Sequence, residues 1–162
     1  MTESVQNLLV RRTIRIEAPP SHVFEVFVTR LDTWWPRSHH IGASAEFEAK
    51  IEPREGGRWY EVGADGKECE WGRVLTWEPP RRIVLSWEIS ATWQHDPSVA
   101  NEVEVRFHPD GEQATLVELE HRKLERYGEH APAMYGAFAS EQGWSGILES
   151  LAAVAKQSAP GT

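Results

Sequence analysis

Apolar and polar residues alternate along much of the chain, and this alternation predicts a series of β-strands. In residues 8–17, Val10, Ile14 and Ile16 are separated by charged or polar residues. The same two-residue period recurs in 45–53, 56–62, 67–78, 81–89, 101–109 and 113–124. A period of two places alternate side chains on one face of a sheet. We therefore predict six or seven strands, each with one apolar face.

Short turn sequences separate these segments and join neighbouring strands into hairpins. Residues 65–66 and 110–111 are Asp-Gly, and residues 79–80 are Pro-Pro. Asp-Gly favours the positive φ angles of tight hairpin turns, and proline suits the corner of a turn. Because a hairpin pairs its two strands in opposite directions, the sequence predicts an antiparallel sheet.

Two other segments have a helical period. Within residues 18–35, Val23, Phe24 and Phe27 recur at helical spacing, and Pro36 ends the pattern, so two short helices are expected after the first strand. Residues 132–157 predict one long helix, in which Gly143 either allows close approach to the sheet or marks a kink. The predicted inward stripe of this helix consists of Ala137, Trp144, Leu148, Leu151 and Ala155.

These elements predict an α+β architecture in which a strongly curved antiparallel sheet wraps around the C-terminal helix. The apolar face of the sheet must be covered, and this helix is the largest element available. A twisted sheet that grips one helix leaves room for a cavity between them. We expect a single domain over residues 1–162, with an ordered core at about 8–157 and a short C-terminal tail.

Composition and charge exclude several classes of protein. The net charge of −8 disfavours binding to nucleic acid or to an anionic membrane surface. No apolar run is long enough to span a bilayer, and the first residues do not resemble an export signal. The single cysteine, Cys69, cannot form an internal disulfide. A cytoplasmic protein is the expectation.

Five segments together resemble the START-like, helix-grip superfamily, also called SRPBCC. These are "RTIRIEAPPSHVFEVF", "IEPREGGRWYEV", "GRVLTWEPPRRIVLSWEI", "LVELEHRKLERYG" and "GWSGILESLAAVA". Within the superfamily, the chain is similar to the group related to the C-terminal domain of the activator of Hsp90 ATPase. The resemblance covers roughly residues 10–155 and implies the helix-grip fold.

The resemblance implies a fold more clearly than a function. Members of the superfamily include lipid and hormone carriers, polyketide aromatase/cyclases and chaperone regulators. The eukaryotic co-chaperone has a separate N-terminal domain that binds Hsp90, and this sequence has no room for one. A Hsp90-type chaperone is therefore a less favoured partner than a small hydrophobic molecule.

Large apolar residues on the inward faces are the candidate walls of a ligand cavity. The alternative is ordinary core packing, because each aromatic ring buries a large apolar area wherever it lies. Eight tryptophans in one domain favour a cavity, and Trp34, Trp35 and Trp93 lie near loops that could rim its opening. The candidate ligand-binding residues are Trp59, Trp71, Leu85, Trp87, Phe107, His121, Phe138, Glu141, Trp144 and Leu148.

A few polar residues share the predicted inward parity. His121 continues the face of its strand, Glu141 lies on the helix stripe, and Arg73 and Glu61 share the parity of inward tryptophans. These groups either orient a ligand and transfer protons or form a satisfied polar cluster. His121, Glu141 and Arg73 are the candidate catalytic residues, with His121 the natural proton carrier.

Motifs for other chemistry are weak. His39-His40 and the His95-Asp96 pair lack the spacing of a metal site, so we expect no metal and no cofactor. The leading hypothesis is a binding protein for a small hydrophobic or aromatic molecule, either monomer or homodimer. The rivals are a cyclase, dehydratase or hydrolase on the same fold, and a co-chaperone-like stress-response interaction domain.

Overall fold

Seven antiparallel strands form one curled sheet, as the sequence predicts. The computed structural model describes residues 8–159, so the first residues of the chain and the end of the predicted tail lie outside it. The order across the sheet is β1-β7-β6-β5-β4-β3-β2, and every neighbouring pair is antiparallel. The strands are β1 (Val10–Ile16), β2 (Phe47–Ile51), β3 (Arg58–Gly63), β4 (Glu68–Glu78), β5 (Arg82–Trp87), β6 (Asn101–Pro109) and β7 (Thr115–Arg122).

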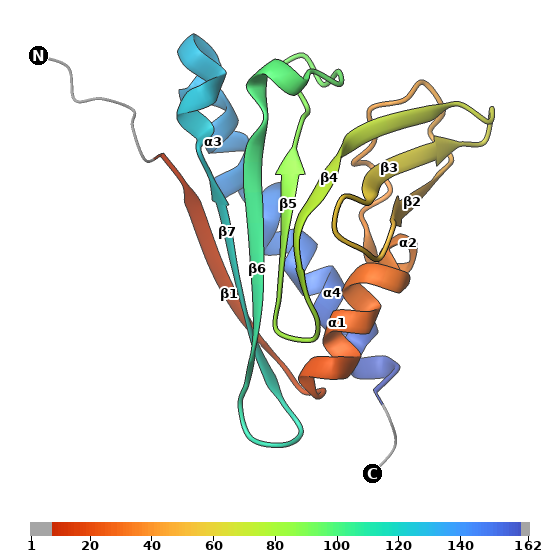
Figure 1. Cartoon of the computed structure of the whole chain (residues 1–162), viewed down its shortest axis with the longest axis vertical. Helices are drawn as coiled ribbons and strands as arrows, with labels where there is room; N and C mark the ends of the chain where they lie inside the picture. Colours follow the sequence, from red (N-terminus) through yellow and green to blue (C-terminus); the bar gives the residue numbers. More distant parts are fainter. Residues whose placement is uncertain (1–7, 160–162) are drawn as a thin grey trace, which may run out of the picture.

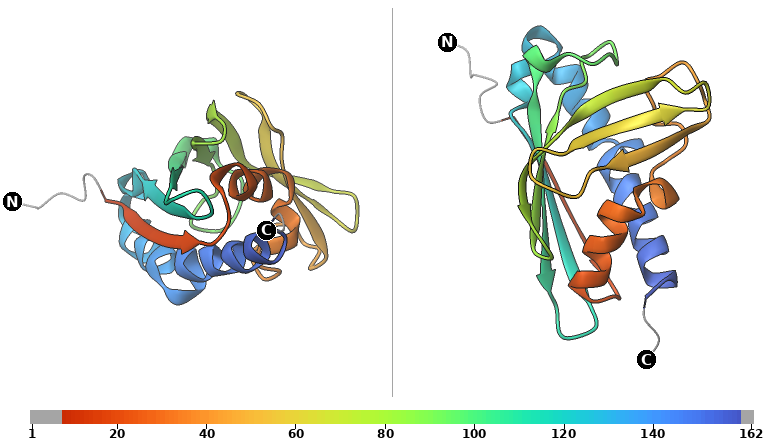
Figure 2. Two further views of the ribbon diagram at one scale, coloured as in Figure 1. Left: turned by 90° about the horizontal axis from the view of Figure 1, so that it is seen from below. Right: turned by 45° about the vertical axis from the view of Figure 1, so that its right-hand side comes forward.

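Helices cover the concave side of this sheet and confirm the helix-grip fold (Figures 1 and 2). The two short helices after β1 are α1 (Pro20–Thr29) and α2 (Leu31–Trp34). The C-terminal elements are a 3₁₀ segment η2 (Leu124–His130), α3 (Ala131–Ala139), a π turn η3 (Glu141–Ser145) and α4 (Gly146–Gln157). A further 3₁₀ turn η1 (Pro97–Val99) precedes β6. None of the helices in residues 8–159 is long and apolar enough to cross a membrane.

The C-terminal helix is interrupted, so the prediction of one continuous helix from 132 to 157 is wrong. Ser140 has an extended backbone, and Gly143 has φ −88° and ψ −136°. A Cβ atom at Gly143 would lie 2.3 Å from the carbonyl oxygen of Phe138, so the chain folds back on itself here and only glycine fits. The alternative that Gly143 marks a kink is the correct one, and α3 and α4 are separate helices.

Two β-bulges in β4 overturn the predicted inward direction of Arg73. Tyr60 pairs with Glu70 and Trp59 with Gly72, so Trp71 is an extra residue opposite β3. Each extra residue shifts the alternation by one position. Arg73 is therefore exposed although Trp71 is buried.

A second bulge follows directly. Val74 pairs with Leu85 and Thr76 with Val84, which leaves Leu75 as the extra residue and 42% exposed. Between the bulges, Gly72 approaches β5 so closely that a Cβ atom would lie 1.9 Å from the carbonyl oxygen of Ser86. The sharp curl of the sheet at β4 therefore depends on glycine at this position.

One end of the space between sheet and helices is packed solid. Phe24 and Phe27 of α1 meet Phe107 of β6 with ring centroids 5.1 and 5.8 Å apart. Trp34 packs on Phe27, and Trp77 packs on Phe24. We call these five residues the filled end.

Candidate functional site

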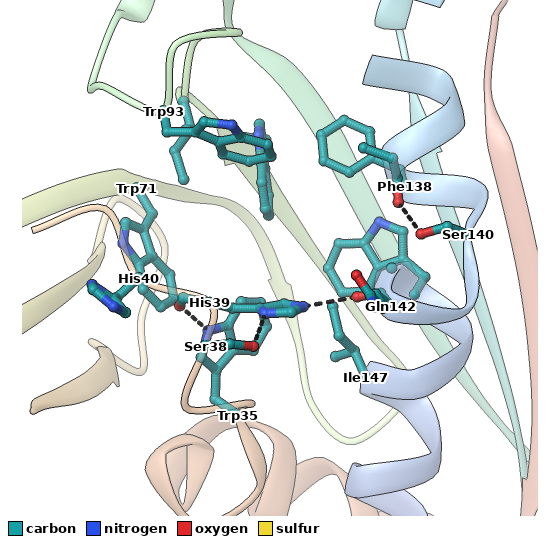
Figure 3. Close-up of a pocket in the computed structure, with 15 residues that line it drawn as sticks. Trp35, Ser38, His39, His40, Trp71, Trp93, Phe138, Ser140, Gln142 and Ile147 are labelled. Carbon is teal, nitrogen blue, oxygen red and sulfur yellow. Dashed lines mark hydrogen bonds between the residues drawn. The ribbon is translucent and has the colours of Figure 1, made fainter. Parts of the chain in front are cut away.

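The opposite end of the grip contains a pocket of about 420 Å³ (Figure 3). It lies among the loop after α2, strands β4 and β5, the loop after β5 and the break between α3 and α4. Its walls are mainly indole rings, and the aromatic residues that line it are Trp35, Trp71, Trp87, Trp93, Phe138 and Trp144. We call these six residues the hollow end.

Polar groups are few in this pocket and come from two places. Ser38, His39 and His40 belong to the loop after α2, while Ser140 and Gln142 belong to the break between the C-terminal helices. Small and aliphatic residues complete the lining, namely Ile89, Ala137, Gly143 and Ile147. The two histidines are therefore the titratable side chains that line the pocket.

A buried carboxylate fixes the Trp71 wall. Glu61 is 1% exposed, and its Oε1 accepts hydrogen bonds from the indole N–H of Trp71 (2.8 Å) and the backbone N–H of Ile41 (2.7 Å). Its Oε2 accepts the backbone N–H of Gly42 at 3.0 Å. Three donors compensate for burying this acid. Glu61 faces inward as its parity predicts, but it supports the pocket wall and the 38–42 loop from behind.

A buried histidine fixes the Trp144 wall in the same way. The indole N–H of Trp144 donates to Nδ1 of His121 at 3.0 Å, and Nε2 of His121 lies 2.5 Å from Oδ1 of Asn101. The ring is therefore neutral, with its proton on Nε2 donated to the amide oxygen. Burial lowers the pKa of His121 to about 3. The Phe138 ring stacks on the imidazole with centroids 4.3 Å apart.

The surroundings of His121 therefore suit a residue that positions Trp144 better than a catalytic residue. Both ring nitrogens are engaged, the side chain is fully buried, and it does not line the pocket. A ligand in the pocket would meet Trp144 and Phe138 rather than the imidazole behind them.

His39 bridges the two sides of the pocket, as Figure 3 shows. Its Nε2 lies 2.8 Å from the backbone carbonyl oxygen of Gln142, and its Nδ1 lies 2.9 Å from the hydroxyl of Ser38. The backbone carbonyl of His39 accepts the indole N–H of Trp35 at 2.8 Å. These contacts join the loop after α2 to the helix break.

The predicted site residues fall into three groups. Four of them line the pocket together, namely Trp71, Trp87, Phe138 and Trp144. Another five are buried but do not line it, namely Trp59, Leu85, Phe107, His121 and Leu148. Arg73 and Glu141 are exposed and outside the pocket, so their predicted inward direction is wrong. Glu141 lies in the helix break, where helical periodicity no longer applies.

Sequence reasoning missed most of the polar lining. Trp35 and Trp93 both line the pocket, Trp35 as a buried residue and Trp93 as an exposed one, whereas Trp34 is buried and its indole N–H is bonded to the carbonyl of Val26. Ser38 and His39 lie in a loop without regular periodicity, and Gln142 lies where the predicted helix is broken, so no pattern placed them in the pocket. Across residues 8–159, no group of three or more His, Cys, Asp or Glu side chains is placed to hold a metal ion.

Comparison with models of known protein families identifies the family of this chain. The family model described as activator of Hsp90 ATPase homolog 1-like protein matches residues 17–156. The chain belongs to this family. The START-like resemblance of the sequence is thereby confirmed, and family membership alone leaves the ligand and reaction open. No curated protein matches the sequence significantly.

Solved structures of the same fold include proteins of known role. The anthrahydroquino-γ-pyrone synthase Txn09, complexed with SUM, is 40% identical over 90% of this chain and 96% of its own, with a TM-score of 0.65. The self-sacrificing resistance protein CalC from Micromonospora echinospora is 24% identical, covers 95% and 97% of the two chains and has a TM-score of 0.68. MLL2253 from Mesorhizobium loti is 15% identical over 94% and 99%, with a TM-score of 0.66.

Proposed function

We propose that this protein binds a flat, fused-ring aromatic molecule of the polyketide type in the hollow end and closes an oxygen-containing ring on it. The observation that carries the proposal is the pocket of about 420 Å³ walled by five tryptophans and one phenylalanine. This volume falls within the range of pockets for drug-sized ligands, roughly 300–1,000 Å³. Aromatic walls favour a flat, apolar ligand over a charged one.

Three of the five indole rings that wall the pocket are held by hydrogen bonds within the protein. Glu61 holds Trp71, His121 holds Trp144, and the backbone of His39 holds Trp35. A wall that is already ordered loses little conformational freedom when the ligand binds, which favours affinity. A rigid cleft also favours one folded conformation of a flexible side chain on the ligand, and such positioning accelerates ring closure.

The relation to the γ-pyrone synthase supports the reaction class. That protein shares 40% identity over nearly the whole of both chains. A γ-pyrone ring forms when a phenol oxygen attacks the distal carbonyl carbon of an ortho-1,3-diketone and one water leaves. This closure requires correct folding and proton transfer but no oxidant and no metal, and the pocket offers apolar walls with a few polar groups on one side.

The test uses two probes. 1,8-Dihydroxyanthraquinone should raise the melting temperature and quench tryptophan fluorescence, because a ligand of the folded state stabilises it by mass action. An ortho-hydroxyaryl 1,3-diketone should be converted to its 4-pyranone faster than in buffer, with loss of one water detected by mass spectrometry. Trp144→Phe should weaken both effects, while Trp77→Phe, at the filled end, should leave them unchanged.

The outcomes separate the two parts of the proposal. Binding with ring closure supports both parts. Binding without ring closure refutes the reaction and favours a ligand-sequestering protein, a role consistent with the low number of ionisable groups in the pocket. If neither probe has an effect, the proposal fails and an interaction role becomes the better hypothesis.

A further inference from the structure

The pocket contains two candidates for proton transfer, and their surroundings differ. Both are histidines of the loop after α2. Nδ1 of His40 lies 2.9 Å from the carbonyl oxygen of Gly42, and its ring packs beside Phe47. His39 instead lies between the two sides of the pocket, beside Ser38 and Gln142 (Figure 3).

The partners of His39 determine which nitrogen carries the proton. The Gln142 carbonyl can only accept, so Nε2 of His39 must be the donor in that contact. In a neutral ring, Nδ1 is then unprotonated and accepts the Ser38 hydroxyl proton. A backbone carbonyl thus sets the tautomer of a histidine whose basic nitrogen faces a hydroxyl group in the pocket lining.

We propose that His39 is the proton acceptor of the pocket and that the Ser38 hydroxyl relays the proton from the ligand. This inference rests on the proposed function and names its acid–base group. The ligand phenol gives its proton to Ser38 Oγ as Ser38 gives its own to His39 Nδ1. The phenolate oxygen then bonds to the distal carbonyl carbon, whose oxygen becomes a hydroxyl by taking up a proton from solvent water.

The second half of the reaction returns the proton. Solvent water accepts a proton from the carbon between the two carbonyl positions, and the ring double bond forms as the hydroxyl group departs. The imidazolium of His39, through Ser38, protonates that hydroxyl so that it leaves as water. Overall one C–O bond and one C=C bond form, the distal C=O bond breaks, its oxygen leaves as water, and no electrons are gained or lost.

The charged side chains near His39 do not line the pocket, which leaves the imidazole as the group that accepts the proton. Arg37, two residues before His39, directs its guanidinium to Asp32 and to the carbonyls of Trp35 and Phe47. Glu141, which precedes Gln142, is exposed and does not line the pocket. Trp35 packs edge-on against the imidazole, with ring centroids 6.3 Å apart. Within the described lining, no carboxylate or ammonium group competes for the proton.

The decisive experiment compares His39→Gln with His40→Gln, which changes the other pocket histidine, and with the control His130→Gln, which lies outside the pocket. His39→Gln should slow ring closure of the diketone about 10²- to 10⁴-fold, the usual contribution of a general base. The dissociation constant of 1,8-dihydroxyanthraquinone should change less than threefold. Ser38→Ala should slow the reaction by a smaller factor, and His40→Gln should slow it far less than His39→Gln. His130→Gln, which changes an exposed histidine outside the pocket, should react at the wild-type rate.

A spectroscopic readout tests the same group without turnover. A base beside the phenol should shift bound 1,8-dihydroxyanthraquinone toward the red-coloured phenolate at a pH where the free dye is neutral. This shift should disappear in His39→Gln and persist in His40→Gln. Added imidazole should partly restore both the shift and the rate in His39→Gln, which a purely structural role of His39 would not allow.

Three results distinguish the two levels of inference. Unchanged turnover and an unchanged phenolate shift in His39→Gln overturn the role of His39 while the proposed function stands. Ligand binding by the wild type with neither a phenolate shift nor turnover overturns both the role of His39 and the proposed reaction. Equal losses in His39→Gln and His40→Gln indicate a general effect of the loop and also overturn the specific assignment.

Discussion

The filled end and the hollow end of the grip are built from the same kinds of residue, but their aromatic rings are held by different contacts. At the filled end, Phe24, Phe27 and Phe107 pack directly on one another. At the hollow end, the indole N–H groups of Trp71 and Trp144 are bonded to the buried side chains of Glu61 and His121, and that of Trp35 is bonded to a backbone carbonyl. The filled end also has an indole bond, from Trp34 to the backbone carbonyl of Val26, so bonds to buried side chains are the feature that distinguishes the hollow end.

This difference shows how an aromatic interior can stay open. Rings gain stability by packing on one another, so a cavity lined by them tends to close. A hydrogen bond to a fixed, buried acceptor makes inward movement of the ring costly, because the acceptor would lose its partner. Glu61 and His121 therefore act on the shape of the pocket although neither lines it.

The largest expected effect comes from a matched pair of phenylalanines, one from each end. Phe107→Ala should lower the free energy of unfolding by about 3–5 kcal/mol, because a solid core is left with a cavity. Phe138→Ala should cost less stability, since its ring already borders the pocket, but it should weaken binding of 1,8-dihydroxyanthraquinone. Urea denaturation and fluorescence titration give the two quantities. Equal stability losses would contradict the distinction between the ends.

Acid should destabilise the hollow end through His121. Burial lowers its pKa to about 3, whereas an unfolded histidine titrates near 6.5. Below about pH 6.5 the unfolded state binds a proton that the folded state does not, so stability is full above that pH and falls toward pH 3. The loss should reach a few kcal/mol. His121→Leu should flatten this part of the stability curve.

A second titratable group, Glu104, provides a check on the assignment of the acid-induced loss of stability to His121. The pKa of Glu104 is lowered to about 2 because hydrogen bonds from Arg82, Arg122 and Arg106 outweigh the opposing effect of burial. Its stabilisation is present above the unfolded value of about 4.3 and is lost toward pH 2. His121→Leu should therefore change the curve between pH 6.5 and 4.5 and leave the Glu104 contribution intact. A wild-type slope in the upper window would refute the role of His121.

Removing the charge of Glu61 should loosen the pocket wall. Glu61→Gln replaces one accepting oxygen with an NH₂ group that faces N–H donors, so a loss of about 1–3 kcal/mol in unfolding free energy is expected. Binding of the anthraquinone should weaken as well. The exposed Glu46→Gln is the control. If Glu61→Gln lowers stability but leaves affinity unchanged, the carboxylate is structural only.

The smallest expected effect concerns the pocket mouth. Trp93 is 47% exposed, lines the pocket and has a φ of 63°, which is uncommon for a bulky residue. Trp93→Ala should reduce anthraquinone affinity about five- to tenfold, because one stacking surface is lost, with little change in stability. Tyr135→Ala, similarly exposed but outside the pocket, is the control. Affinity equal to the wild type would remove Trp93 from the site.

The sequence predicted the regular strands of the sheet correctly and missed the bulges that interrupt their alternation. Alternation placed Val103, Val105, Val117 and Leu119 inward correctly, because β6 and β7 pair without a bulge. The same rule failed at Arg73, because the bulge at β4 depends on how the sheet curls rather than on local propensity.

The site was harder to predict than the core for the same reason. Glu141 was placed inward by a helical period that the backbone abandons at Ser140. His39 lies in a loop, and its contact with Gln142 joins positions 103 residues apart. Periodicity describes neighbours along one element and carries no information about such distant contacts. The tryptophans were identifiable by type, but which of them line the pocket depends on the three-dimensional fold.

The break between α3 and α4 divides the C-terminal segment into two helices whose sequences can change to different extents during evolution. Leu148 and Leu151 of α4 are buried in the core, where a change in volume is costly. Phe138 and Ala137 of α3 face the pocket, where a change in volume alters the space available to a ligand. Because Gly143 separates the two helices, α3 can evolve toward a new ligand while α4 preserves the fold.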